Sequence, residues 1–588
     1  MRKNRIHRKG TEGFTKDAIR AFADHMFHGS HQLSKLEYAM DMGEAIDSAR
    51  KEAAEDRSDT NRATHLVNEV QKRNEFIMNP TGGAVAHAIS QAGFIYHLAA
   101  TPAAAMVNLS QSVILGVPIM SAYLNKNNPA VSSGKVSKQL IRATADFTRG
   151  KGWIEKSKKL TPDEKKAMEV GYATGTIDRT QSHDLAGVAE SGISYNATRQ
   201  KVMKGLGFAF HHAERFNREV TFLASYRLAR QEGESHDKAI DTANDLTWKV
   251  HFDYQNTSRP RVMQNDTAKV LLLFRNYSAN MLYRLARDVY KSINPKDPAE
   301  RKEALTQFAG ITGMMMLHAG VRGTWFFGIA TAIASVFMDD GDDPEEEMKK
   351  AMIDAIGPTA TGLALNGVPG HALGWDLSGR IGMPDLWFRS SYKELEGEDA
   401  YNYWLSQAAG AAPSMALNAF KGMAMAAKGN VYRGIETAMP KIIKDQMRAY
   451  RYMTDGAETM KGDDILPEMT PWEGISQSLG FAPAALSERY KQNSANMNKQ
   501  EAILAARSNL LSQYYKADEA SNEAELDKLD KEIDKFSDKY PEQKITGKTL
   551  NRSIRTREKN SDRNVGGINY NEKLKDRILN EQSMSIYR

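Results

Sequence analysis

A segment of 50 residues, Phe76 to Asn125, contains no Asp, Glu, Lys or Arg, although 26% of the chain is charged. A helix on a soluble surface needs a charged or polar face, so this segment has to lie inside protein or inside lipid. A second apolar segment, Phe308 to Met338, carries one formal charge, Arg322. The two segments limit the chain to a membrane-active protein or a subunit of a large helical assembly.

Neither segment is a clean membrane-spanning helix. A spanning helix needs about 20 apolar residues, and the densest part of the first segment is interrupted by Pro102 and Pro118. In the second segment Arg322 lies near the middle, where a charge is costly in a bilayer. Two alternatives stay open: a buried core helix, or a segment stored in protein contacts and later inserted in a membrane. In the second case Arg322 would face a lumen or a partner protein.

Composition narrows the class of protein further. The chain has 588 residues, a formal charge of +6 and no cysteine. This length predicts more than one domain, and the absence of cysteine excludes disulfides, thiolate metal ligands and cysteine nucleophiles. The mild positive charge is too small for a dedicated nucleic-acid coat. No apolar secretory core follows the basic N-terminus, so we expect synthesis in a cytoplasm.

The periodicity of apolar residues predicts an all-α fold: an elongated multi-helix assembly with apolar Gly/Ala/Met-rich helices. Long amphipathic helices are expected over 199–232 and 262–292. Thr161-Pro162 and Asp343-Pro344 have the composition of helix starts. The 28 methionines suit either a loosely packed core or a surface that repacks.

Four regions are expected along the chain. Residues 1–75 form a charged helical N-terminal region, and residues 76–490 form the main helical domain with apolar blocks 76–125 and 308–338. Residues 491–540 form a C-terminal helical hairpin, because apolar residues recur there at 3-4-3-4 spacing. These are Leu526, Leu529, Ile533, Phe536 and Tyr540. Residues 541–588 are polar and predicted to be an extended tail.

Catalytic motifs do not emerge from the sequence. His211, His212 and Glu214 lack the spacing of a zinc helix. The acidic run 339–347 lacks the spacing of a calcium loop and is better explained by helix capping. We therefore expect no enzymatic activity, no cofactor and no metal site.

Three stretches resemble a known family: HHAERFNREVTFLASYRLA from His211, FDYQNTSRPRV from Phe252, and AKVLLLFRNYSANMLYRLAR from Ala268. They are similar to the C-terminal region of large phage polyvalent proteins, the PLxRFG-type domain, which is associated with virions of short-tailed phages. The name-giving Pro and Gly are not intact here, where the chain reads LLLFRNY. The residues that carry the resemblance are Glu214, Asn217, Arg218, Phe252, Asp253, Tyr254, Arg259, Pro260, Phe274 and Arg275. The stretches Asn108–Gln111 and Gly370–Gly382 are also similar to that family.

The resemblance implies a phage internal virion protein that is ejected ahead of the genome and helps to form a conduit through the host envelope. Its expected partners are other virion ejection proteins, further copies of itself, the host inner membrane or envelope, and DNA in non-specific contact. It would be located in the virion interior and, after ejection, in the host cell envelope. Two alternatives remain: a host-delivered effector domain, or a static internal core or portal-associated scaffold.

The residues themselves suggest a structural role. Glu214 and Arg218 are four residues apart on one predicted helix and can form an ion pair. We expect Glu214, Arg218, Asp253 and Arg259 to be buried or paired and to hold helices together. On the predicted helix 262–292 a basic side suits anionic lipid or DNA phosphate, or is simply a solvated face. Its members are Arg275, Arg284, Arg287 and Lys291.

Overall fold

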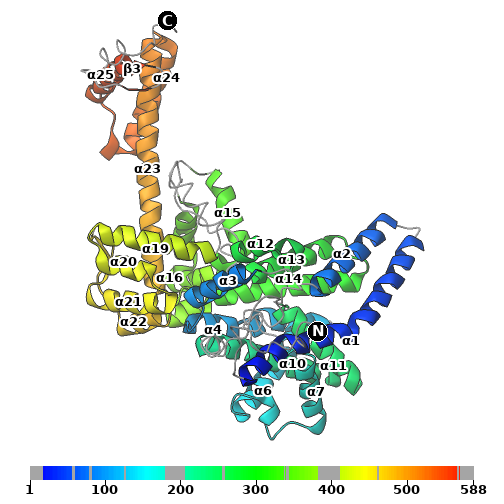
Figure 1. Cartoon of the computed structure of the whole chain (residues 1–588). Helices are drawn as coiled ribbons and strands as arrows, with labels where there is room; N and C mark the ends of the chain where they lie inside the picture. The colour runs from blue at the N-terminus through cyan, green and yellow to red at the C-terminus, as the bar shows by residue number, and fades with distance from the viewer. Residues whose placement is uncertain are drawn as a thin grey trace, which may run out of the picture. The chain divides into compact units, whose positions relative to one another are not determined.

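The structure is a computed structural model, and nearly all of its regular elements are helices (Figure 1). It describes residues 18–55, 60–78, 83–124, 128–178, 205–253, 259–273, 275–336, 338, 343–381, 411–459, 462–565 and 568–569. Within these residues the predicted all-α fold is confirmed. The chain forms two compact units. Unit 1 comprises Met1–Gly328, Ile356–Ser390 and Leu395–Arg489, and unit 2 comprises Ile329–Ala355, Ser391–Glu394 and Tyr490–Arg588.

The N-terminal half contains the helices that surround the core. They are α1 (Ala18–Glu55), α2 (Thr60–Met78), α3 (Ala84–His97), α4 (Pro102–Leu109), the π-helix η2 (Ser112–Gly116), α5 (Val117–Leu124), α6 (Pro129–Arg149), η3 (Ile154–Lys156), α7 (Pro162–Ala173), α10 (Phe208–Gln231) and α11 (His236–His251). Helix α10 packs against α4, α6, α7 and α11. It is buried over most of its length, so it is the central element of unit 1.

The middle of the chain adds further helices and one small β-ladder. The helices are η5 (Arg261–Met263), α12 (Asp266–Leu271), α13 (Arg275–Ile293), α14 (Pro298–Ala319), η6 (Val321–Gly323), α15 (Trp325–Val336), α16 (Pro344–Leu373), α17 (Ser378–Ile381), α19 (Ala411–Ala427), α20 (Val431–Ala438), α21 (Lys441–Thr454) and α22 (Pro471–Ser478). Strand β1 (Ala457–Glu458) pairs antiparallel with β2 (Asp464–Leu466), with Ala457 opposite Leu466. The prediction of one continuous helix over 262–292 is wrong, because Asn265 caps a separate helix, α12, that ends before α13 begins.

Local sequence determines several helix starts. Thr161 caps α7 in a capping box with Glu164, and Pro162 occupies the first turn, as the sequence predicts. The Asp343 carboxylate accepts hydrogen bonds from the backbone N–H groups of Glu345 and Glu346 at the start of α16. These caps satisfy N–H groups that have no partner inside the helix.

The first apolar segment forms part of the protein core. Elements α4, η2 and α5 pack against α10, α6 and α14, and Leu115, Ile119 and Met120 are at most 1% exposed. Within the described residues one helical run, Pro102–Leu124, is long and apolar enough to cross a membrane. Of its most apolar 18 residues, 61% are buried in protein. Burial inside protein is therefore the state that this structure describes for the segment.

The second apolar segment is broken into α14, η6 and α15. The break occurs at Gly320, whose φ of 70° lies in the region that favours glycine. Upstream of it, Ile311, Met315 and Ala319 are buried in the core of unit 1. Downstream, α15 exposes Ile333, at 57% of its surface. The two parts of the segment therefore differ in environment.

Unit 2 contains the predicted hairpin and a third helix. Helix α23 (Ala484–Glu519) is followed after a short turn by α24 (Glu523–Lys539), then by η8 (Pro541–Gln543), α25 (Gly547–Arg563), and the pair β3 (Asn564–Val565) and β4 (Ile568–Asn569). The expected extended tail is corrected for residues 547–563, which are helical. The physical reason is apolar burial: Ile545 and Leu550 pack into a cluster with Leu511, Ile533 and Phe536. Residues 570–588 of that tail lie outside the described part.

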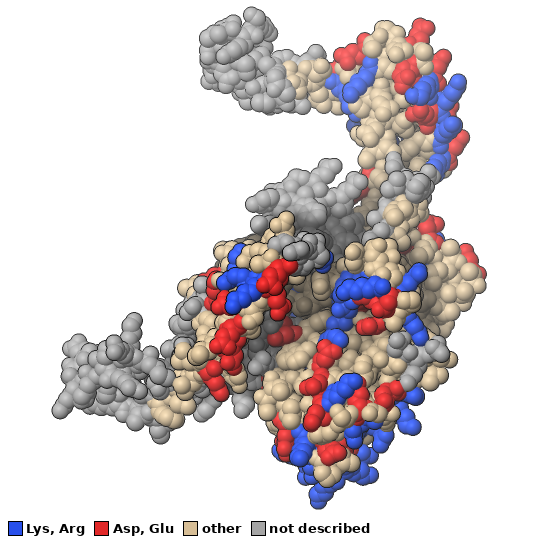
Figure 2. All heavy atoms as spheres, turned by 90° about the vertical axis from the view of Figure 1, so that its right-hand side faces the viewer, with Lys and Arg blue, Asp and Glu red and all other residues tan. Residues whose placement is uncertain are grey.

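Charges of both signs are interspersed on the face in Figure 2. Lys and Arg side chains lie beside Asp and Glu side chains there, and no broad positive patch is seen. This pattern agrees with the small net charge of the chain.

Candidate functional site

The most unusual feature of α10 is a set of buried charged and amide side chains. Arg218, Asn217 and Glu219 are 0% exposed, and Glu214 is 2% exposed. Burying ionised groups is costly unless they are paired and hydrogen-bonded. Each of these groups has partners within the protein.

Arg218 connects α10 to two other segments. Its guanidinium donates to the carbonyl oxygens of Thr176 (3.1 Å), His251 (3.3 Å) and Phe252 (2.7 Å). The last two carbonyls belong to the C-terminal end of α11, where a cation is favoured by the helix dipole. On the same helix, Glu214 forms an ion pair with Arg218 at 3.7 Å. The expectation that Glu214 and Arg218 are buried and hold helices together agrees with these contacts.

Phe252 ends α11 with φ 55° and ψ 167°, a conformation that costs a non-glycine residue of the order of 1–3 kcal/mol. The hydrogen bond from Arg218 to its carbonyl holds the chain in this turn. The turn directs the next residue, Asp253, into a pocket described below. Buried Arg218 therefore positions the edge of a surface pocket.

Asn217 connects α10 to the first apolar segment. Its amide nitrogen donates to the backbone and side-chain oxygens of Asn108 at 2.6 and 2.9 Å. Its side-chain oxygen accepts from the Ser112 hydroxyl at 2.8 Å. Nearby, Gln111 donates to the carbonyl of Val250 at 3.1 Å. The Asn108–Gln111 and His211–Ala229 stretches, which carry the family resemblance separately in the sequence, thus lie in direct contact.

A second buried pair lies one residue further along α10. Arg215 and Glu219 form an ion pair at 3.2 Å, and the Tyr172 hydroxyl and the Ile154 N–H donate to the Glu219 carboxylate at 2.7 and 2.8 Å. Arg215 also lies 3.5 Å from the centre of the Trp153 ring. Burial raises the pKa of Glu219, against the opposing effect of these donors. Sequence reasoning missed this pair, although its i,i+4 spacing was a usable signal.

His251 is buried against the same helix. Its Nε2 lies 2.8 Å from the Thr221 hydroxyl of α10, and its side chain is 1% exposed. Burial and the charge of Arg218 lower the pKa of His251 well below 6.5. The imidazole is therefore neutral in the folded protein at neutral pH.

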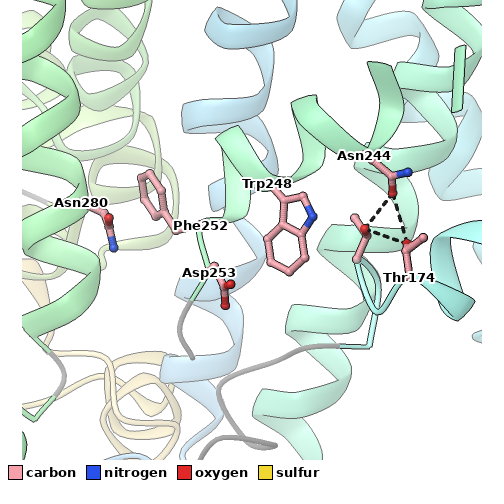
Figure 3. A pocket seen from close by; sticks show the side chains of 7 residues that line it. Thr174, Asn244, Trp248, Phe252, Asp253 and Asn280 are labelled. Carbon is pink, nitrogen blue, oxygen red and sulfur yellow. Dashed lines mark hydrogen bonds between the residues drawn. The ribbon is translucent and has the colours of Figure 1, made fainter. Parts of the chain in front are cut away.

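A pocket with a volume of about 580 Å³ opens beside this cluster (Figure 3). Its described lining is Thr174, Thr176, Asn244, Trp248, Phe252, Asp253 and Asn280. Figure 3 shows the Trp248 ring between Asp253 on one side and the group formed by Asn244 and the two threonines on the other. Sequence reasoning proposed only Phe252 and Asp253 of this set.

The remaining predicted site residues lie between the end of α11 and the first residue of α13. Arg259 is half-buried, and its carbonyl accepts from Gln264 at 3.3 Å. Pro260 is exposed and precedes η5, and Arg275 is half-buried at the start of α13. None of these three is among the partners of the Arg218 guanidinium given above. Two further predicted residues, Tyr254 and Phe274, lie outside the described residues.

The predicted basic face of the 262–292 segment is corrected. Arg284 is 6% exposed, and it donates to the carbonyl of Lys249 at 2.6 Å and to Gln307 at 3.3 Å. Burial lowers the pKa of Arg284 to about 10. Arg287 pairs with Asp288 at 2.8 Å, and Lys291 pairs with Glu300 at 2.8 Å. The charges serve contacts within the protein, so they do not form a free basic surface.

Arg322, the predicted membrane or lumen residue, is 6% exposed. Its guanidinium donates to Asn366 at 2.8 Å and pairs with Glu488 at 2.9 Å. The structure therefore places Arg322 inside protein, where it joins η6 to α16 and to the start of α23.

Trp375 and Asp376, in the Gly370–Gly382 stretch of the resemblance, also make buried contacts. The Trp375 ring stacks on Phe481 at 4.0 Å with an interplanar angle of 1°, and its Nε1 donates to the Ser476 hydroxyl at 2.9 Å. The backbone N–H of Asp376 donates to Ala482 at 3.0 Å. These contacts attach Trp375 and Asp376 to α22 and to the segment that follows it.

The buried polar cluster of α10 connects neighbouring helices to one another. Its charged groups are enclosed and bonded to one another or to backbone carbonyls, so a substrate would not reach them. In the described part of the chain, no three His, Asp or Glu side chains come close enough to hold a metal ion. The pocket at Trp248 is open to solvent and large enough to admit a small molecule.

Comparison of the chain with protein-family models, with curated proteins and with solved structures finds no match.

Proposed function

We propose that this chain is an internal virion protein of a phage, ejected into the host envelope to help form a conduit for the genome. One observation carries the proposal: the stretches that carry the family resemblance converge in unit 1. Asn217 binds Asn108, Arg218 binds Phe252, and Trp375 stacks in the same core cluster. Buried signature residues that connect separate helices are what a shared structural domain requires, and this supports reading the resemblance as one of fold.

A structural role also follows from the enclosure of the signature. Arg218 and Asn217 have no exposed surface, so their side chains serve the packing and the register of the helices. On this proposal the chain is not an enzyme. Its partners are other ejection proteins, further copies of itself and the host envelope, with non-specific contact to DNA.

The apolar helices support a membrane role after ejection. The run Pro102–Leu124 has the length and composition of a membrane span, and α15 carries no charged residue. Refolding in an envelope would exchange their protein contacts for lipid contacts. The absence of cysteine removes any disulfide that would obstruct passage through a tail.

The experiment compares intact phage particles with particles emptied of DNA. Quantitative mass spectrometry of both should show this chain in intact particles and its loss, relative to the major capsid protein, from emptied ones. Retention in emptied particles would favour a static core or portal-associated scaffold. Absence from intact particles would remove the virion assignment altogether.

A host-delivered effector domain is the second candidate, and the pocket at Trp248 favours it because a conduit subunit needs no ligand site. Fractionation of infected cells separates the two functions. A conduit protein should be found in the membrane fraction, whereas an effector should be found in the host cytosol.

A further inference from the structure

The pocket at Trp248 combines an aromatic ring with amide, hydroxyl and carboxylate groups. Its volume of about 580 Å³ lies within the roughly 300–1,000 Å³ of small-molecule sites. Trp248 is half-buried and presents an apolar ring surface of the kind that packs against weakly polarised C–H groups.

The hydrogen bonds of the two asparagines orient their amides. The Asn244 side-chain oxygen accepts from Thr176 at 2.7 Å and from Thr174 at 3.4 Å, which leaves its NH₂ group as a donor to a ligand. The Asn280 NH₂ group donates to the carbonyl of Asn276 at 2.9 Å, which leaves its oxygen as an acceptor. Asn280 and Asn244 lie on opposite sides of the Trp248 ring in Figure 3, and their hydrogen bonds leave one as an acceptor and the other as a donor.

The charges around the pocket disfavour both anionic and cationic ligands. Asp253 is the charged side chain in the described lining, so a phosphate or carboxylate ligand would be repelled. Asp253 would attract a cation, but the Arg218 guanidinium lies 5.0 Å from the centre of the Trp248 ring and its positive charge opposes that attraction. A neutral ligand satisfies both conditions.

We propose that this pocket binds a neutral sugar. Hydroxyl groups both donate and accept, so they match the oriented amides, and the C–H face of a pyranose ring matches the indole of Trp248. The volume accommodates one or two sugar rings. This inference stands independently of the function proposed above.

The test is saturation-transfer NMR on the full-length protein. The neutral probes are glucose, galactose, N-acetylglucosamine and the β-1,4-linked dimers of each, and the charged probes are glucosamine and glucose 6-phosphate. We expect at least one neutral probe to bind at millimolar concentration, with its ring C–H protons receiving most of the saturation. Glucosamine and glucose 6-phosphate should bind more weakly than glucose.

Three variants assign the binding to this pocket. Asn280→Ala and Trp248→Leu should each weaken the neutral sugar by about fivefold or more, since each removes one contact to the ligand. Asn294→Ala, an exposed asparagine just beyond the same helix α13, should leave the affinity unchanged. Because Trp248 packs near Arg218, the Trp248→Leu variant could also lose stability, so its affinity is compared only if its melting temperature equals that of the unsubstituted protein. Asn280→Ala provides the second, independent measurement.

Three results would overturn the proposal. The first is the absence of binding by every neutral probe to folded protein. The second is neutral binding that Asn280→Ala leaves intact. The third is stronger binding of a charged probe than of glucose.

Discussion

At the scale of single residues, Arg218 makes the largest expected contribution to stability. Arg218→Ala leaves the Glu214 carboxylate without its ion-pair partner in a buried site and three carbonyls without their donor. Loss of one partner of a buried pair costs about 3–5 kcal/mol. The variant should therefore have a lower free energy of unfolding in a urea titration. Arg230→Ala, an exposed arginine at the end of the same helix, is the control and should cost less than about 1 kcal/mol. Equal midpoints for the two variants would contradict the structural assignment of Arg218.

His251 gives stability a pH dependence. Its folded pKa is lowered by burial and by Arg218, so the unfolded chain binds a proton near pH 6.5 that the folded chain does not. Its contribution is fully present above pH 6.5 and is lost as the pH falls below that value, by up to about 1.4 kcal/mol per pH unit. His251→Gln should make the fall in melting temperature between pH 6.5 and 5 shallower. Other titrating groups, including Glu219, are common to both proteins, so identical slopes would refute this role of His251.

At the scale of elements, α25 should stabilise the hairpin of unit 2. Leu550 of α25 and Ile545 just before it, which is 5% exposed, pack with Leu511, Ile533 and Phe536. Truncation after Tyr540 should therefore speed hydrogen exchange throughout α24, whereas truncation after Arg563 should leave it unchanged. Ile545→Ala alone should cost about 2–4 kcal/mol in that unit. If the shorter chain protects α24 as well as the longer one does, α25 is dispensable for the hairpin.

Elements with local signals were the ones that sequence reasoning predicted well. The capping box of Thr161 with Glu164, and the spacing of Leu529, Ile533 and Phe536, depend only on neighbouring residues. The continuous helix predicted over 262–292 was wrong, because the amphipathic pattern continues across the α12–α13 break. Helix α25 was missed because its mean composition is polar, and two apolar contacts with other helices suffice to hold it.

At the scale of the whole molecule, the proposed membrane activity predicts binding to anionic liposomes at high salt, with leakage of their contents. Ile333 of α15 is 57% exposed, and an aspartate placed there would enter hydrocarbon, at about 2.5–3.5 kcal/mol at mid-bilayer. Ile333→Asp should therefore reduce flotation with liposomes and dye release. Ile293→Asp is the matched control, an isoleucine that is 71% exposed at the end of α13. Equal liposome binding by the two variants would exclude α15 as the inserting element.

The candidate pocket marks the limit of prediction from sequence for the whole chain. Thr174, Asn244, Trp248 and Asn280 come from three separated segments, and only Asn244 and Trp248, four residues apart on α11, are related by a local spacing. The buried cluster was partly predictable because Glu214 and Arg218 share one helix face. Its connection to Asn108 was unpredictable by physical reasoning from the residues, since it depends on how α4 crosses α10.

The close approach of the backbone at Gly320, just after α14, to the backbone at Gly367 of α16 has a consequence for the mutational tolerance of the chain. Gly320 and Gly367 both have positive φ, and a Cβ atom on either would collide with main-chain atoms near the other: Leu365 in one case and His318 in the other. Main-chain atoms cannot be replaced by a smaller side chain, so a second-site substitution has no way to relieve either collision. In a saturation library of this gene, these two positions should accept glycine alone, and sequence drift elsewhere in both helices should leave them fixed.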